Sequence, residues 1–333
     1  DISLVDTVNL CHPARTEALT KLMTGTLKNT ETWEAKISEA GQAGTEEVAN
    51  ELKNDAWREL LESKKLGYLA CLRNLRNINT QAVDCIPLAC ELITNEELIQ
   101  KAMIFPFQFN TAFHELLKAS VSRELIVAVN KALEISVKNV PKFDGKLLVV
   151  FDASGSMRGA DPKSPYNIGA LFASVLFKAN DADLMLFAEQ AAYIPLNPLD
   201  TIGTLQQHLH RVAPVNSGTN FDVPFQVANK KYDRIVVLSD SQGWIGPSVP
   251  KLAFSQYRLK YSADPIIYSF DLKGYGTMQF PEKNTCCIAG FSDKVFDVMK
   301  LLETDKQALI HEVEKINIVV GVKPDLISSD VAV

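Results

Sequence analysis

The sequence lacks the long apolar run that a membrane-spanning helix requires. Its longest apolar stretch, from Leu147 to Phe151, has the length of a β-strand, whereas a spanning helix takes roughly 20 apolar residues. The chain also begins at Asp1 on a helical pattern, with neither an initiating methionine nor a signal peptide. We therefore expect no membrane anchorage, and a chain that is shortened at its N-terminus.

The sequence also lacks the motifs of common enzymes. It contains neither the G-x-S-x-G of serine hydrolases nor the phosphate-binding G-x-x-x-x-G-K. His208 and His210 fall on an amphipathic stretch away from the predicted strand ends, so the serines at those ends have no general base. The six cysteines form no C-x-x-C pair, and most have apolar neighbours, as reduced thiols of cytoplasmic proteins do. These absences predict a cytoplasmic protein that is not an enzyme.

The sequence also has no excess of positively charged residues. The 333 residues carry 34 Lys and Arg against 40 Asp and Glu, which gives a formal net charge of −6. A protein coated by nucleic acid needs clustered basic residues, so any RNA site must be a local basic patch. The length and the 47% apolar content are sufficient for two globular domains.

The first part of the chain, residues 1–140, has the periodicity of helices. Apolar stripes with helical spacing occur at Ala18–Met23, Val48–Leu61 and Leu125–Val137. Polar breaks typical of helix caps occur at Asn29-Thr30-Glu31, Asn79-Thr80 and Thr94-Asn95-Glu96-Glu97. About eight helices in this length favour antiparallel pairs stacked as a HEAT-like solenoid, although no clean sequence repeat is present.

The second part, residues 141–333, alternates apolar strands with helical patterns. We expect strands at 146–151, 183–188, 234–239 and 265–270, and helices at 168–178, 204–212, 221–228 and 249–261. This order predicts a doubly wound, mainly parallel α/β sheet of the Rossmann-like kind. The boundary between the two parts lies where Pro141 and Gly145 interrupt the helical pattern.

Three polar segments follow the predicted strands or precede a helix, and together they suggest a metal site. Asp152, Ser154 and Ser156 form a D-x-S-x-S motif directly after the first strand, Thr219 precedes a helix, and Asp240 follows another strand. Ligands bind such sheets at the carboxyl ends of the strands. Carboxylates and hydroxyls suit Mg²⁺, Mn²⁺ or Ca²⁺ rather than zinc, with Mg²⁺ the default.

A simpler interpretation is that Asp152 and the two serines only form a turn and cap the next helix. All three segments occur in the expected order at strand ends, which favours the metal site. The set matches the metal-ion-dependent adhesion site of von Willebrand A domains and integrin I domains. That resemblance implies direct binding by the serines, an open coordination position, and a partner carboxylate that fills it.

Five stretches of the chain resemble the Ro (TROVE) family. They are Val8-Asn9-Leu10-Cys11-His12-Pro13, residues 69–78 (LACLRNLRNI), residues 102–107 (AMIFPF), the Asp152 motif, and Ala289-Gly290-Phe291-Ser292 running on to Val298. The resemblance implies a ring of helical repeats closed against a von Willebrand A domain. Such a ring binds a small structured Y RNA outside and single-stranded ends of misfolded RNA through its hole. This chain has about half of the usual helical sequence, which puts closure of the ring in doubt.

The resemblance also suggests RNA contacts. The turn at His12 matches the family loop that contacts Y RNA, and Arg15 and Lys21 give it a basic edge; a polar helix cap is the alternative. Arg73 and Arg76 lie among leucines, so we expect them to bond carbonyls or carboxylates inside the solenoid rather than phosphates. The aromatic run of Phe105, Phe107, Phe109 and Phe113 is expected to pack in the core rather than stack on bases.

We therefore expect a non-catalytic RNA-binding protein of noncoding-RNA quality control. Its partners would be Y-like RNA and single-stranded RNA ends. The alternative is a metal-dependent protein-interaction module, in which the metal captures a partner's carboxylate and the helices form a scaffold.

Overall fold

The computed structural model describes residues 3–26, 32–42, 44–159, 161, 163–212, 218–241, 251–274, 284–290, 292, 294–305 and 307–316. The chain divides into two compact units, Asp1–Ser136 and Val137–Val333, each treated separately below. Within the described residues, no helix is both long and apolar enough to cross a membrane.

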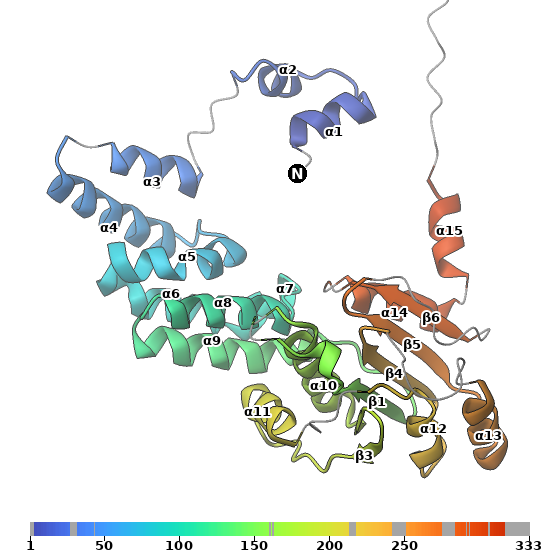
Figure 1. The fold of residues 1–333 in the computed structure, drawn as a ribbon. Helices are drawn as coiled ribbons and strands as arrows, with labels where there is room; N and C mark the ends of the chain where they lie inside the picture. The colour runs from blue at the N-terminus through green and yellow to red at the C-terminus, as the bar shows by residue number, and fades with distance from the viewer. Residues whose placement is uncertain are drawn as a thin grey trace, which may run out of the picture. The chain divides into compact units, whose positions relative to one another are not determined.

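The first unit is helical, as the periodicity predicts (Figure 1). Its helices are α1 (Leu4–Cys11), α2 (Glu17–Met23), α3 (Trp33–Gly41), α4 (Glu46–Glu62), α5 (Tyr68–Gln81), η1 (Val83–Cys85), α6 (Ile86–Ile93), α7 (Glu96–Lys101), α8 (Pro106–Lys118) and α9 (Arg123–Ser136). Helix α3 packs on α4, α5 on α6, and α8 on α9, while α5 also contacts α8 and α6 contacts α9. This stacking of helix pairs is the arrangement of helical-repeat proteins.

Buried aromatic residues hold these helix pairs together. Trp57 of α4 is completely buried, and its Nε1 donates a hydrogen bond to Gln81 Oε1 of α5 at 2.9 Å. Phe105, Phe107 and Phe109 are buried, which confirms their predicted place in the core, whereas Phe113 is only half-buried. Each large aromatic side chain removes much apolar surface from water, so these contacts are a main source of the unit's stability.

Of the predicted helix caps, the one at Asn95 is confirmed and the one at Asn79-Thr80 is wrong. Asn95 caps α7, because its side chain accepts a hydrogen bond from the backbone N–H of Leu98 at 3.0 Å. The predicted break at Asn79-Thr80 is wrong, since both residues lie within α5. There the Thr80 hydroxyl donates to the carbonyls of Arg76 and Asn77, which satisfies it inside the helix. The predicted cap at Asn29-Thr30-Glu31 lies outside the described residues.

The second unit contains a six-stranded sheet in the order β3-β2-β1-β4-β5-β6. The strands are β1 (Leu147–Asp152), β2 (Asp183–Phe187), β3 (Ala191–Tyr193), β4 (Arg234–Ser239), β5 (Ile266–Asp271) and β6 (Thr285–Ala289). The helices are η2 (Val137–Asn139), η3 (Gly155–Met157), α10 (Pro165–Asn180), α11 (Ile202–Val212), α12 (Val223–Val227), α13 (Lys251–Tyr261), α14 (Val295–Thr304) and α15 (Ala308–Glu314). Among the strands of the described residues, β3 alone is antiparallel to its neighbour, so the predicted mainly parallel sheet is confirmed.

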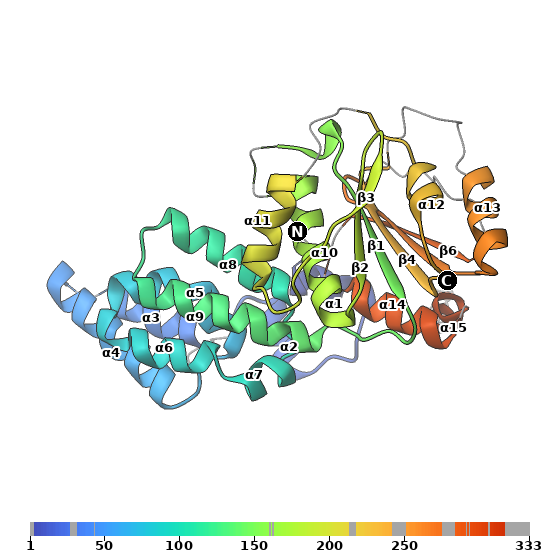
Figure 2. The same cartoon turned by 90° about the horizontal axis from the view of Figure 1, so that it is seen from below.

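Helices cover both faces of this sheet (Figure 2). On one face, α12 and α13 bury Phe225 and Phe254 against alternate strand residues such as Val150 and Val237. On the other face, Phe172 of α10 contacts Phe270 of β5 and Phe296 of α14. Because strand side chains alternate between the faces, the central strands are apolar on both sides and appear as continuous apolar runs in the sequence.

The topology brings the carboxyl ends of β1 and β4 together at one edge. The chain passes from β1 to β2 and β3 on one side, then crosses to β4 and β5 on the other. The order of the strands therefore reverses between β1 and β4. Such a switch point leaves a crevice between the two following loops, where doubly wound proteins bind their ligands.

Candidate metal site and RNA-binding surfaces

Asp152 is the last residue of β1, and hydrogen bonds fix both of its carboxylate oxygens. Oδ1 accepts the backbone N–H of Ser154 at 2.8 Å, and Oδ2 accepts the hydroxyl of Ser239 at 2.5 Å. Ser239 ends β4, so the two central strands hold the carboxylate between them. The side chain is completely buried, which fixes its position at the switch point.

The two serines of the motif face each other in the next turn. Ser154 Oγ lies 3.2 Å from Ser156 Oγ, and Ser154 is completely buried while Ser156 is half-buried. The short 3-10 helix η3, in which the backbone N–H of Arg158 donates to the carbonyl of Gly155, closes this turn. The D-x-S-x-S spacing thus presents one carboxylate and two hydroxyls from a single tight loop.

Thr219 comes from a second loop that attaches to the same edge. The backbone N–H of Asn220 donates to the carbonyl of Ala188 at 2.9 Å, and that of Ala153 donates to Phe187 at 2.8 Å. Both loops therefore bind the carboxyl end of β2, which places Thr219 close to the β1 loop. The Thr219 hydroxyl is buried and has no hydrogen-bond partner among the described residues.

Asp240 directly follows β4 and is completely buried. Neither of its carboxylate oxygens accepts a hydrogen bond from the described residues. The ammonium of Lys273 lies 3.2 Å from Oδ2, which is the distance of an ion pair without the geometry of a hydrogen bond. The same ammonium donates to the carbonyl of Ser156 at 2.8 Å. Asp240 thus sits beside the β1 loop with unused acceptor capacity.

The electrostatics of this edge suit a cation. Burial raises the pKa of the Asp152 carboxyl to about 6, against the lowering effect of the hydrogen bonds from Ser239 and Ser154, and the negative charge of Asp240 adds to the rise. A divalent cation would stabilise both ionised carboxylates, and Thr219 Oγ1 and Asp240 Oδ1, which lack hydrogen bonds from the described residues, could serve as its ligands. The five residues therefore fit a hard oxygen-liganded cation, and their role as its ligands stays a prediction.

The donor set explains why a zinc-type site does not fit here. Among the residues with described positions, no group of three or more His, Cys, Asp or Glu side chains is arranged to hold a metal. Three of the five candidate ligands are hydroxyls, which leave room for the water molecules that Mg²⁺ retains.

Sequence reasoning missed two residues of this edge. Ser239 orients Asp152, and its only sequence signal is a hydroxyl residue at the end of an otherwise apolar strand. Lys273 reaches the edge from the loop after β5, at a position that no motif identifies.

Two of the three residues predicted to contact RNA at the N-terminal turn line the same hollow. His12 and Arg15 line the same hollow of about 410 Å³ with residues of α1 and α2. Lys21 does not line this hollow and instead pairs with Glu17 one helical turn away at 2.7 Å. The basic character of the hollow therefore comes from Arg15, with His12 held in a left-handed backbone conformation at the end of α1.

The expectation for Arg73 and Arg76 is wrong. Both side chains are exposed on α5, and neither has a hydrogen-bond or ion-pair partner among the described residues. Cys71, Leu75 and Ile78 occupy the buried face of this helix, and the helical period places the two arginines on the outer face. The adjacent leucines misled the sequence interpretation, because neighbours in sequence point to different sides of a helix.

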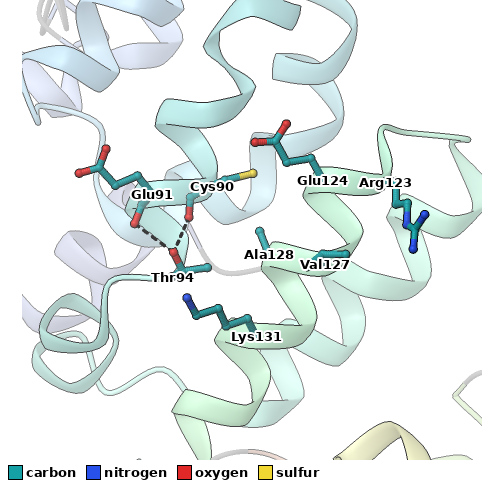
Figure 3. Close-up of a pocket in the computed structure, with 8 residues that line it drawn as sticks. All are labelled: Cys90, Glu91, Thr94, Arg123, Glu124, Val127, Ala128 and Lys131. Atoms are coloured by element: carbon teal, nitrogen blue, oxygen red, sulfur yellow. Dashed lines mark hydrogen bonds between the residues drawn. The ribbon is translucent and has the colours of Figure 1, made fainter.

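A second hollow of the first unit lies between α6 and α9 (Figure 3). Its floor includes Cys90, whose pKa burial raises to about 11, so it is a neutral thiol. The basic Arg123 and Lys131 and the acidic Glu91 and Glu124 all line this hollow. This mixture of charges does not select for an anionic ligand.

Two protein-family models match this chain, and several solved structures are similar to parts of it. The family model for the TROVE domain matches residues 10–158, and the model for the Ro60 von Willebrand A (vWA) domain matches residues 146–302. The crystal structure of the Deinococcus radiodurans Ro (RSR) protein is similar with a TM-score of 0.61 and 21% identity, covering 89% of this chain and 69% of that one. Proximal thread matrix protein 1 from the mussel byssus has a TM-score of 0.33 and 16% identity, covering 56% of this chain and 51% of that one.

The two family matches follow one another along the chain in the order that the fold shows. The TROVE match covers the helices from the end of α1 onward, the vWA match contains the parallel sheet, and the two overlap at residues 146–158, which include the Asp152 motif. The chain therefore belongs to the Ro (TROVE) family of RNA-binding proteins, with a vWA domain of the Ro60 type.

Proposed function

We propose that this chain binds a small structured, Y-like RNA and the single-stranded ends of misfolded RNAs, and acts in RNA quality control without catalysis. The TROVE match over residues 10–158 is the observation that carries this proposal. The two histidines considered as bases, His208 and His210, lie on α11 and not on the loops of the Asp152 edge, which supports a binding role over an enzymatic one.

Exposed arginines give the proposal a surface to act through. Arg73 and Arg76 stand on α5 one turn apart, exposed and without a partner among the described residues. Unpaired guanidinium groups bind phosphates without first breaking an ion pair, and their planar donors match phosphate oxygens. At His12 and Arg15 the N-terminal turn offers a second, smaller contact.

Filter binding of a structured Y-like RNA across a salt series tests this function. The double variant Arg73→Gln/Arg76→Gln should bind at least about tenfold more weakly, and its slope of log affinity against log salt should be shallower by about one to two. A matched control, Lys142→Gln/Lys300→Gln, removes two exposed charges from the second unit and should leave binding unchanged. Absence of wild-type binding at low salt would refute the RNA proposal.

The edge of the vWA domain favours a second candidate function. One divalent cation, Mg²⁺ by default with Mn²⁺ or Ca²⁺ as alternatives, would be held by Asp152, Ser154, Ser156, Thr219 and Asp240 and would bind a carboxylate of a protein partner. The buried Thr219 hydroxyl and Asp240 carboxylate, which accept no hydrogen bond from the described residues, support it. Affinity purification with and without chelator separates the two functions. Metal-dependent partners should vanish with EDTA or in Asp152→Ala and should survive RNase, whereas RNA-bridged partners should show the reverse.

We place this activity in the cytoplasm. All six cysteines are free thiols, including the exposed Cys11 and Cys287, and free thiols persist in reducing compartments.

A further inference from the structure

The loop after β5 is built to hold Lys273 at the metal-site edge. Asp271 ends β5, and its Oδ1 accepts the backbone N–H groups of Lys273 at 3.1 Å and Gly274 at 2.9 Å. Gly274 has a φ of +74°, a conformation that glycine adopts without strain. The backbone of Lys273 is therefore fixed, and only its side chain is left to move.

The Lys273 ammonium bridges two loops that carry candidate metal ligands. It donates to the carbonyl of Ser156 and lies beside Asp240 Oδ2, at 2.8 and 3.2 Å. The Lys273 side chain is 27% exposed, while the Asp240 side chain it neutralises is fully buried. One end of this ion pair therefore has a path to solvent and the other has none.

The charges at this edge disfavour the binding of a divalent cation while the Lys273 ammonium is beside Asp240. Asp152 and Asp240 supply two negative charges, and Lys273 is the positive charge in contact with Asp240. A divalent cation on the Asp240 oxygens would stand a few ångströms from the ammonium, where like charges repel strongly in a buried site. A flexible four-carbon stem allows the ammonium to withdraw toward water, whereas Asp240 is held directly after β4.

We propose that Lys273 is a built-in cation that competes with the divalent metal for Asp240, so that the metal binds only by displacing the ammonium. This inference rests on the proposed metal site. Lys273 should therefore stabilise the edge when no metal is bound, and the same side chain should weaken the affinity of the edge for metal. A lysine that merely positioned Asp240 for the metal would strengthen that affinity instead.

Calorimetric titration with Mn²⁺, together with melting in EDTA, tests the competition. Lys273→Met removes the charge and keeps most of the apolar stem. It should bind Mn²⁺ roughly tenfold or more tightly than wild type, because no cation must leave, and it should melt at a lower temperature in EDTA. Lys273→Arg keeps the charge and should bind as weakly as wild type. Lys294→Met, which removes an exposed lysine from the same unit, should change neither quantity.

The possible outcomes separate the proposed competition from the proposed metal site. Equal or weaker Mn²⁺ binding by Lys273→Met, with wild type still binding, would overturn the competition and leave the metal site standing. No Mn²⁺ binding by wild type, Lys273→Met or Lys273→Gln would refute the metal site itself. Binding by the neutral variants but not by wild type would be the strongest support. Lys273→Gln serves the same purpose if the methionine variant does not fold.

Discussion

Replacing Asp152 with alanine should abolish the stabilisation of this protein by divalent metal ions. Two buried oxygens at the vWA edge, Thr219 Oγ1 and Asp240 Oδ1, have no hydrogen-bond partner among the described residues, and Asp240 Oδ2 has only the Lys273 ammonium beside it at 3.2 Å. An unsatisfied buried polar group costs about 1–3 kcal/mol, so a cation that ligates Thr219 Oγ1 and Asp240 Oδ1 relieves a local cost of that order. Asp152 is the second carboxylate of the predicted ligand set and senses the charge of Asp240, so without it the cation loses half of the anionic charge around it.

The expected shift follows from mass action. At a metal concentration about a hundred times the dissociation constant, binding to the folded state adds about 2.7 kcal/mol. In a unit of this size 1 kcal/mol moves the melting temperature by roughly 2–4 °C, so wild type should melt roughly 5–11 °C higher in millimolar Mg²⁺ or Mn²⁺ than in EDTA. Asp152→Ala should show no shift.

The alanine variant itself should stay folded. The variant loses the two hydrogen bonds that Asp152 accepts from Ser154 and Ser239. It also loses the cost of a buried carboxylate, whose pKa is raised by burial and by the charge of Asp240, and this gain offsets the loss. Differential scanning fluorimetry is the assay. Asp144→Ala is the matched control, because Asp144 is exposed near the opposite end of β1, and this variant should shift with metal as wild type does. Equal metal-dependent shifts in wild type and Asp152→Ala, or no shift in either, would refute the reasoning.

Three further predictions concern the two cores and the thiols. Trp57→Ala should lower the free energy of unfolding by about 3–5 kcal/mol in denaturant titrations, because it empties a fully buried site in α4; a loss under about 1 kcal/mol would contradict the packing. Gly169→Val should cost at least about 1–3 kcal/mol, since a Cβ at this position would stand 2.4 Å from the Phe151 ring; an unchanged melting temperature would count against it. Alkylation followed by mass spectrometry should modify the exposed Cys11 first and Cys71 last, because burial raises the pKa of the Cys71 thiol to about 12; early labelling of Cys71 would show that its surroundings open.

Elements whose side chains repeat with a regular period were open to prediction from the sequence. The strand that ends at Asp152 and the strand that ends at Ser239 are apolar on both faces, so their buried state appears directly in the sequence as continuous runs. The edge strands β3 and β6 were not predicted, because their residues are only half-buried or exposed and their small and sulfur-containing side chains lack the β-branched character of the central strands. The Asn95 cap was predictable because a cap acts over a few residues.

The sequence by itself determined the family, the order of the two domains and the position of the D-x-S-x-S loop, because each depends on local pattern and motif. Only the tertiary structure decided that Arg73 and Arg76 face outward without partners, since exposure depends on which helix covers which face. It alone brought Ser239 to Asp152 across 87 residues and Lys273 to Ser156 across 117 residues. These contacts follow from strand order and loop closure at one sheet edge, and a non-local juxtaposition of that kind leaves no periodic trace in the sequence.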